Sequence, residues 1–503
     1  MKLTSKITAI CALLLMPSLA KAQFIGTYTS SVGSSVAGLP AKGSDITTNG
    51  INGPMFSTGS FTGTADFDPT ASTYNLTANS SNGAVYVQQL HSASSVFVWA
   101  VAIQPSVSSP STVTSSSIIA DNDYIYITGS FSGTVDFDPG AAISNLTASG
   151  GKDAYVLKLT TAGAFVWVRK IGGVSDDAGV CISNNGNLNI VGTFSGTIDL
   201  DPSGLTLNRT SNGLKDFFVL KLTTAGNMLW GTSIGGTGDD VATSVVSGSY
   251  GIVISGNYEA TVDFNPDTPV YNVTNVDSGA DGFLLKLSDA GVMGWVANIN
   301  SVGGQAYATD VAHFLQESTQ KSYFFVCGEF IGTLQMTTAK GKVVGGTPNN
   351  LNAGYVLRVD ANGFAEWIKF LDNPAGTPQS VEEPSTISVV SMYNTGIVYV
   401  AGQTLGTTDY DADPATSYNL TASNGSTFVM RWDTDGVFDW AYVINPSSYD
   451  WPSSFCTSHG GYAQLYLTGT FGGTVDFDFT PAVNSRTATG AQDAYSVKWQ
   501  ENW

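Results

Sequence analysis

Short apolar runs separated by glycine-rich polar turns fill almost the whole chain, and they predict β-strands. Residues 124–127 alternate before Gly129, and residues 153–159 form a second run after a turn at Pro139. A third run carries Trp167 and follows a turn at Gly163. No segment shows the 3.6-residue period of an amphipathic helix. The pattern therefore predicts an all-β fold with little helix.

The same group of runs occurs seven times. Its marker is a glycine that follows the alternating run and returns every 63 to 74 residues. The seven glycines are Gly59, Gly129, Gly192, Gly256, Gly328, Gly402 and Gly469. Counting a short strand before each marker, every copy contains about four strands. Because seven copies fill nearly all of residues 23–503, the repeat decides the fold.

Small sheets without covering helices can bury both faces by standing radially around an axis. We therefore expect one domain, residues 23–503, folded as a closed seven-bladed β-propeller. The last copy ends without a Trp-bearing strand, and residues 24–28 read like that missing strand. We expect the N-terminal strand to complete the last blade. An open solenoid is the alternative, but it would need distinct polar caps at both ends.

Three motifs support a family resemblance. They are the Gly-Thr-Val-Asp-Phe-Asp-Pro phrase at Gly133, the Asp-Ala-Tyr-Val-Leu-Lys-Leu phrase at Asp153, and the Gly-Gly pair at Gly172. The units resemble the seven-bladed propeller repeats (SBBP-like repeats) of exported Bacteroidota proteins. Many such proteins carry a C-terminal sorting domain for the type 9 secretion system, whereas this chain ends within its last copy. The resemblance implies the propeller fold of that family and export from the cytoplasm. It gives little indication of an activity.

The first 22 residues have the pattern of a signal peptide. Lys2 and Lys6 precede an apolar run at residues 7–15, and Ala20 and Ala22 frame the cleavage site. We expect an exported protein located in the periplasm or at the outer membrane, or alternatively outside the cell. No later run is long enough to cross a bilayer, so we expect no direct membrane insertion.

Acid pairs with one residue between them follow the marker glycine in several copies. These pairs are Asp66/Asp68, Asp136/Asp138, Asp199/Asp201 and Asp476/Asp478. Side chains at i and i+2 of a strand point the same way, so the two carboxylates would converge, as calcium prefers. Alternatively, the second Asp caps the turn before proline while the first is solvated at the sheet edge. On the sequence alone, calcium binding and turn capping both remain open. Calcium is the one cofactor that these residues suggest.

Six tryptophans occupy one position of the first six copies, which predicts packing between sheets. They are Trp99, Trp167, Trp230, Trp295, Trp367 and Trp440. Trp451 lies outside that position and is a better candidate for an exposed aromatic platform. Cys181, Cys327 and Cys456 fall in or beside apolar runs, which predicts small buried side chains rather than a disulfide framework. His91, His313 and His459 have no ligand-like spacing.

The net charge and the catalytic motifs limit the classes of function that fit the sequence. The chain has 40 Asp+Glu against 20 Lys+Arg and a net charge of −20, which argues against nucleic acid as a partner. It has no HExxH, GxSxG or phosphate-loop motif, so we expect no enzyme. Residues 303–322 and 375–388 are read as longer loops, which favour a binding face.

We therefore expect a non-catalytic scaffold that binds a protein, in an outer-membrane assembly such as a secretion translocon that it would cap or plug. The alternative is a lectin-like or sialidase-like propeller that binds or hydrolyses glycans. Exposed aromatic side chains and a dedicated acid pair at the central channel would favour that alternative.

Overall fold

The computed structural model describes most of the chain from Gln23 to Asn502. Within that range it leaves out residues 35–39, 51–52, 71, 92–95, 108–109, 276, 278, 338–342, 349–351, 373–380, 393–394, 414, 460–461 and 481. The described residues form strands, turns and loops. None of these segments is a helix that could cross a membrane. The predicted signal segment, residues 1–22, lies outside the described residues.

Each repeat contributes four antiparallel strands, in the order predicted from the sequence. The first strands are β2 (Ala41–Thr48), β8 (Thr112–Ala120), β12 (Asp177–Asn184), β18 (Val241–Gly248), β23 (Met293–Gln316), β28 (Val381–Met392) and β32 (Tyr449–His459). The second strands are β3 (Met55–Phe61), β9 (Tyr124–Asp136), β13 (Asn187–Phe194), β19 (Gly251–Tyr258), β24 (Lys321–Thr337), β29 (Thr395–Asp409) and β33 (Ala463–Gly472).

The third and fourth strands complete each group. The third strands are β6 (Ala84–Leu90), β10 (Asn145–Thr160), β16 (Asp216–Thr223), β22 (Asp281–Leu287), β26 (Ala353–Asp360), β30 (Asn419–Asp433) and β36 (Asp493–Asn502). The fourth strands are β7 (Phe97–Pro105), β11 (Phe165–Gly173), β17 (Met228–Ile234), the first half of β23, β27 (Ala365–Leu371), β31 (Phe438–Ile444) and β1 (Gln23–Ser34). Strand β23 thus serves repeats four and five, and β1 serves repeat seven.

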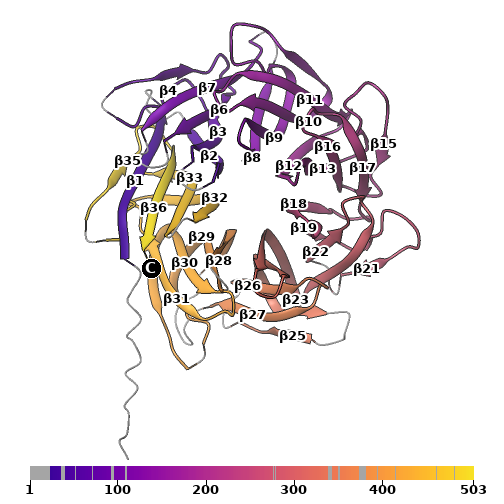
Figure 1. Ribbon diagram of the computed structural model, residues 1–503, viewed down its shortest axis with the longest axis vertical. Coiled ribbons are helices and arrows are strands. Elements are labelled where there is room, and N and C mark those ends of the chain that lie inside the picture. The colour runs from indigo at the N-terminus through magenta and orange to yellow at the C-terminus, as the bar shows by residue number, and fades with distance from the viewer. Residues whose placement is uncertain are drawn as a thin grey trace, which may run out of the picture.

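The groups stand around a common centre, with the first strands innermost (Figure 1). Each first strand contacts the first strand of the next repeat, and β2 also contacts β32. The indigo β1 lies beside the yellow β36 and pairs with it antiparallel, from Gln23 opposite Asn502 to Val32 opposite Ala494. The two ends of the described chain therefore share one sheet, as the sequence predicts.

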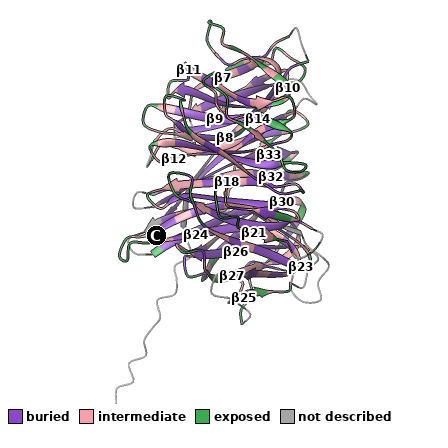
Figure 2. Cartoon of the chain, turned by 90° about the vertical axis from the view of Figure 1, so that its right-hand side faces the viewer, coloured by how far each residue is buried: buried purple, intermediate pink, exposed green. Residues whose placement is uncertain are grey.

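The middle strands are buried on both faces because each sheet packs between two neighbours (Figure 2). All eight residues of β19 are buried. Core contacts run from one repeat to the next, as where the rings of Phe217 and Phe283 stack with centroids 5.2 Å apart. Such runs show no alternation because neither face meets water.

Outer ribbons connect neighbouring repeats. The separate ribbons are β4 (Thr64–Asp66) with β5 (Asn75–Thr77), β14 (Thr197–Asp199) with β15 (Asn208–Thr210), β20 (Thr261–Asp263) with β21 (Asn272–Thr274), and β34 (Thr474–Asp476) with β35 (Ser485–Thr487). In repeats two and six the second and third strands themselves continue into the ribbon. In repeat five, β25 (Val343–Gly346) pairs with β24.

The ribbon of one repeat pairs with the fourth strand of the previous one. In the third repeat, Ile198 of β14 lies opposite Gly173 of β11. A Cβ atom on Gly173 would lie 1.9 Å from the carbonyl oxygen of Thr197, so this close approach requires glycine. Strand β1 pairs in the same way with β4 of the first repeat, where Gly33 lies opposite Asp66.

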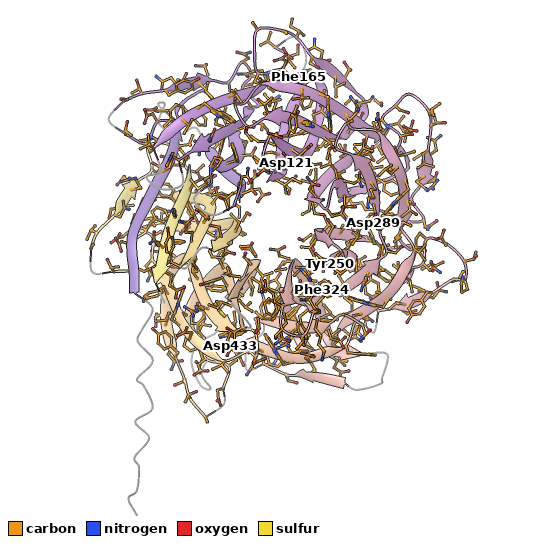
Figure 3. All side chains as sticks on the ribbon, in the orientation of Figure 1. Asp121, Phe165, Tyr250, Asp289, Phe324 and Asp433 are labelled. Atoms are coloured by element: carbon orange, nitrogen blue, oxygen red, sulfur yellow. The ribbon has the colours of Figure 1, made fainter. Side chains whose placement is uncertain are left out.

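The repeat tryptophans form a second connection. The indole of Trp230 packs against Gly291 in the next repeat's turn, and its N–H donates to the carbonyl of Asp289 at 3.1 Å (Asp289 is labelled in Figure 3). Gly291 has a φ of +84°, which favours glycine. Trp99, Trp295 and Trp367 donate to the matching carbonyls at 3.0 to 3.2 Å. The predicted packing role of these tryptophans is confirmed.

Two loop predictions were wrong. Residues 303–316, expected in a loop, continue strand β23, and the tight turn after it spans residues 317–320. Residues 381–388, expected in the second loop, belong to β28, and residues 375–380 lie outside the described residues. Both stretches mix polar with apolar residues: residues 303–316 contain Gly, Gln, Thr and Asp, and residues 381–388 contain Glu, Pro, Ser and Thr. Pairing with β24 and β29 extends these strands despite that composition.

Candidate functional site

The paired aspartates cap the loops at the tips of the outer ribbons. Oδ1 of Asp136 accepts the N–H of Asp138 at 3.1 Å and that of Ser144 at 2.8 Å. Oδ1 of Asp138 accepts the N–H of Gly140 at 2.8 Å. The second Asp is therefore a turn cap, as one interpretation predicted. The first Asp does more than solvate an edge, because it ties both ends of the loop together.

The same pattern recurs at the other pairs. The first acids, Asp66, Asp199 and Asp476, each accept two backbone N–H groups, and the second acids, Asp68, Asp201 and Asp478, each accept one. Each pair supplies two carboxylates, whereas calcium takes six to eight oxygens. No group of three His, Cys, Asp or Glu side chains suited to a metal ion occurs among the described residues. The acids fit loop capping, and calcium binding stays a prediction.

One acid pair lies in a groove between the first and second repeats that polar and apolar residues line together. The groove has a volume of about 520 Å³, and its lining includes Tyr74, Val107 and Ile143 together with Asp136 and Asp138. Val107 and Ile143 are among the most exposed apolar side chains, at 76% and 74%. Exposed apolar side chains beside an acid pair are suited to an apolar segment flanked by a base.

The first strands carry a polar girdle that the sequence analysis did not identify. Each first strand has a register shift, and the residue after it points to the neighbouring first strand. Asp45 accepts the N–H of Ile118 at 2.6 Å and the hydroxyl of Ser454. Asp310 accepts the N–H of Ile387 at 2.9 Å. These bonds link successive repeats at the centre.

The girdle lines a small, open hollow of about 130 Å³ on the inner face. Burial raises the pKa of Asp45 to about 6 and also raises that of Asp310. Burial likewise raises the pKa of Cys181, which lies on the same girdle, to about 11. The carboxylates hold backbone N–H groups, and the thiol stays protonated at neutral pH, so this cluster serves structure. No sequence signal separated these polar residues from ordinary strand residues.

The histidines and remaining cysteines are not brought together. His313 packs against the rings of Tyr250 and Phe324, which Figure 3 labels side by side. Burial lowers the pKa of His313 to about 4. Cys327 is fully buried and Cys456 half-buried, both as free thiols. The predicted packing role is confirmed for Cys327, while the side chain of His459 lies outside the described residues.

Trp451 lies on β32 with its side chain 51% exposed, as its position outside the repeat predicted. It lines a cavity of about 460 Å³ at the junction of repeats seven, one and two. This cavity and the outer groove each combine exposed apolar side chains with polar groups suited to a partner.

Comparison with known proteins gives distant similarity. The chain is 22% identical over 416 residues to "Regulatory protein FlaEY" of Caulobacter vibrioides, covering 71% of this chain and 43% of that protein. It is 22% identical over 282 residues to an uncharacterized WD repeat-containing protein of Acanthamoeba polyphaga mimivirus, covering 48% of this chain and 20% of that one. The chain thus spans less than half the length of these curated relatives.

No family model matches the sequence. Among solved structures, the extracellular domain of a B. thetaiotaomicron protein assigned to the hybrid two component systems aligns over 93% of this chain and 82% of that chain. Its identity is 10% and its TM-score 0.17, a value that carries no conclusion. The similarity to a WD repeat-containing protein agrees with the internal repeats and the strands seen here. The chain is a repeat-built, all-β protein.

Proposed function

We propose that the chain is a closed seven-bladed β-propeller whose last blade is completed by the N-terminal strand. The support is the recurrence of four strands in each repeat, the contacts between successive first strands, and the pairing of β1 with β36. We also propose that it belongs with the SBBP-like repeats of exported Bacteroidota proteins. In a propeller, short protected edges and mutual burial of sheet faces replace covering helices.

The proposed function is that of an exported, non-catalytic scaffold that binds another protein. The observation that carries this proposal is the groove between the first and second repeats, with exposed Val107 and Ile143 beside an acid pair. Apolar side chains this exposed are unfavourable in water unless a partner covers them. The acids Asp136 and Asp138 would favour a basic residue at the rim of the contact.

The same position of the outermost strands differs between repeats. Val98, Val166 and Leu229 are 39 to 50% exposed on the fourth strands of repeats one to three. The matching positions of repeats five and six are Glu366 and Asp439, which pair with arginines at 2.9 and 3.1 Å. Apolar side chains at this position of repeats one to three favour a partner that docks on these three strands.

The setting proposed for this binding is an outer-membrane assembly, reached through the signal peptide of residues 1–22. In such an assembly the scaffold would act as a cap or plug of a translocon. The test is extraction of the tagged protein from its native host in mild detergent, followed by identification of co-purifying proteins. We expect stoichiometric recovery of an outer-membrane protein.

A matched pair of variants locates the contact. Ile143→Asp places a charge in the groove, and recovery of the partner should fall at least tenfold. Val437→Asp alters a side chain 62% exposed in the sixth repeat, away from the groove, and recovery should not change. Isolation of the chain alone, or equal recovery with both variants, contradicts the proposal.

A further inference from the structure

Trp451 differs from the six repeat tryptophans in its surroundings. Those six pack at the junctions between repeats, whereas Trp451 points from the first strand of repeat seven with half of its side chain exposed. No hydrogen bond from its indole to another described residue is found. A large aromatic ring held in place by a strand, yet open to solvent, is a binding platform in many proteins.

A second aromatic ring stands on the same face of the strand. Tyr449 and Trp451 are two residues apart on β32, so their side chains project the same way. Both line the cavity of about 460 Å³, within the range typical of small-ligand sites. Most of the other lining residues lie on β2 and β8, so three neighbouring first strands form much of the site. Ser60 of β3, Thr470 of β33 and Gln492, just before β36, complete the lining.

The rest of the lining is polar and carries no acid. Ser44, Thr114 and Ser453 belong to the lining, together with Gln492 and the exposed Lys42. The lining contains no Asp or Glu, although the chain has 40 of them. The hydroxyl of Ser453 donates to the carbonyl of Gly43 at 2.9 Å, which joins β32 to β2 and fixes the wall.

We propose that this cavity binds a saccharide. A sugar ring presents an apolar C–H face that stacks on an indole, and hydroxyl groups that exchange hydrogen bonds with neutral Ser, Thr and Gln side chains. Lys42 adds a positive charge without a carboxylate nearby in the lining, so a sugar that carries a carboxylate gains an ion pair. A nucleotide would call for more than one cation for its phosphates. This inference does not rest on the protein partner proposed above.

The test uses the whole mature chain, residues 23–503, on an array of neutral and uronic-acid-containing oligosaccharides, followed by titration calorimetry with the strongest ligand. Trp451→Ala should weaken binding at least tenfold, whereas Trp451→Phe, which keeps a stacking ring, should remain within about threefold. Lys42→Gln should weaken acidic oligosaccharides more than neutral ones. The matched control is Tyr271→Ala, which removes an aromatic ring 48% exposed in the fourth repeat and should leave binding unchanged.

Three results would overturn the inference. They are no oligosaccharide bound above background, equal binding by wild type and Trp451→Ala, and Trp451-dependent capture of a protein in place of a sugar. Thermal melting of each variant verifies its fold, and Trp451→Phe keeps the comparison valid if Trp451→Ala does not fold. Ile143→Asp, in the outer groove, should bind the sugar normally, so failure of the saccharide site and failure of the protein contact are distinguished.

Discussion

Two junctions between repeats are held by different hydrogen-bond acceptors. They are the junction of repeats four and five and the junction of repeats six and seven. At the first, the indole of Trp295 and the ammonium of Lys286 both donate to the main-chain carbonyl of Ala361, at 3.0 and 3.2 Å. At the second, Trp440 donates at 2.9 Å to the carboxylate of Glu501 on β36, which also accepts from Arg431. Glu501 has no exposed side-chain surface.

The difference lies in the group that each repeat presents to the tryptophan of the previous one. Repeats two, four, five and six present a main-chain carbonyl of a glycine turn, whereas repeat seven presents the side chain of Glu501 on β36. A buried side chain therefore replaces a main-chain group. A main-chain acceptor is present whatever residue occupies the turn, whereas the last junction depends on one residue and on the charge that matches it.

Loss of Glu501 should have the largest effect. In Glu501→Ala, Arg431 loses its buried partner, and the indole of Trp440 and the hydroxyl of Tyr399 lose an acceptor. Although Arg431 keeps its ion pair with Asp439, three donors lose a buried acceptor at once, so the free energy of unfolding should fall by about 3 kcal/mol or more. Urea unfolding measures it. Lys286→Met, the matched change at the junction of repeats four and five, should lower the free energy of unfolding by about 1 to 2 kcal/mol. Equal losses in the two variants would contradict the difference between the two junctions.

Substitution of the two tryptophans compares the charged acceptor with the neutral one. Trp440→Phe removes a hydrogen bond to a charged carboxylate, and Trp295→Phe removes one to a neutral carbonyl. We expect losses of about 2 and about 1 kcal/mol, since hydrogen bonds to charged groups contribute more. Chemical denaturation of both variants in one buffer gives the comparison. A larger loss for Trp295→Phe would show that ring packing outweighs the acceptor.

Buried acids make the pH dependence differ between repeats. Burial raises the pKa of both Asp240 and Asp450 to about 7. The folded protein then binds the proton more tightly than the unfolded chain, so each acid lowers stability as pH rises from about 4 to about 7. Asp240 accepts the N–H groups of Gly236 at 2.6 Å and Glu259 at 3.1 Å, whereas the hydroxyls of Thr427 and Tyr495 lie beside Asp450.

Asp450→Asn should therefore raise the melting temperature at pH 8 and flatten its fall between pH 4 and 7. Asp240→Asn should give no gain at pH 8, because an amide satisfies the two N–H groups less well than a carboxylate. Melting curves at intervals between pH 4 and 8 test both variants against wild type. If the melting temperature of Asp450→Asn changes with pH in parallel with that of wild type, burial of Asp450 does not cause the loss of stability between pH 4 and 7.

The smallest effect is expected at an exposed acid. Asp289 pairs with Lys221, and this pairing holds the pKa of the Asp289 carboxyl below its usual value, but the side chain is 65% exposed. In Asp289→Ala the main-chain carbonyl of residue 289 still accepts from Lys221 and Trp230. The loss should be at most about 0.5 kcal/mol, measured by urea unfolding. A loss comparable to that of Glu501→Ala would contradict the difference between the two kinds of junction.

Much of this architecture could be predicted from local patterns. The strand order, the shared sheet of β1 and β36, and the packing of the repeat tryptophans all follow from periodicity and repetition. The junction donors could not be found this way, because Lys286 looks like any outward residue of an alternating strand. Likewise, Asp45 acquires its role only when β8 places the N–H of Ile118 beside it.

The candidate site was predicted less well than the fold. The sequence singled out Trp451 because it breaks the repeat, but Tyr449, Lys42 and Gln492 come from segments that only the assembled sheets bring together. The acid pairs were visible in the sequence. The turn cap made by the second acid was among the interpretations of the sequence. The bond from the N–H of Ser144 to Asp136 depends on the path of residues 138–144, which local composition did not reveal.

Because β1 pairs with β36, the first described strand can reach its final position only after the last one has formed. Joining chain ends separated by several hundred residues costs about 5 kcal/mol in loop-closure entropy, so this pairing is expected late in folding. Until then β36 presents an unpaired edge, to which another chain could add a strand. A chain that lacks β1 would keep the edge of β36 exposed permanently, so the N-terminal strand protects the sheet of repeat seven against strand addition by another chain.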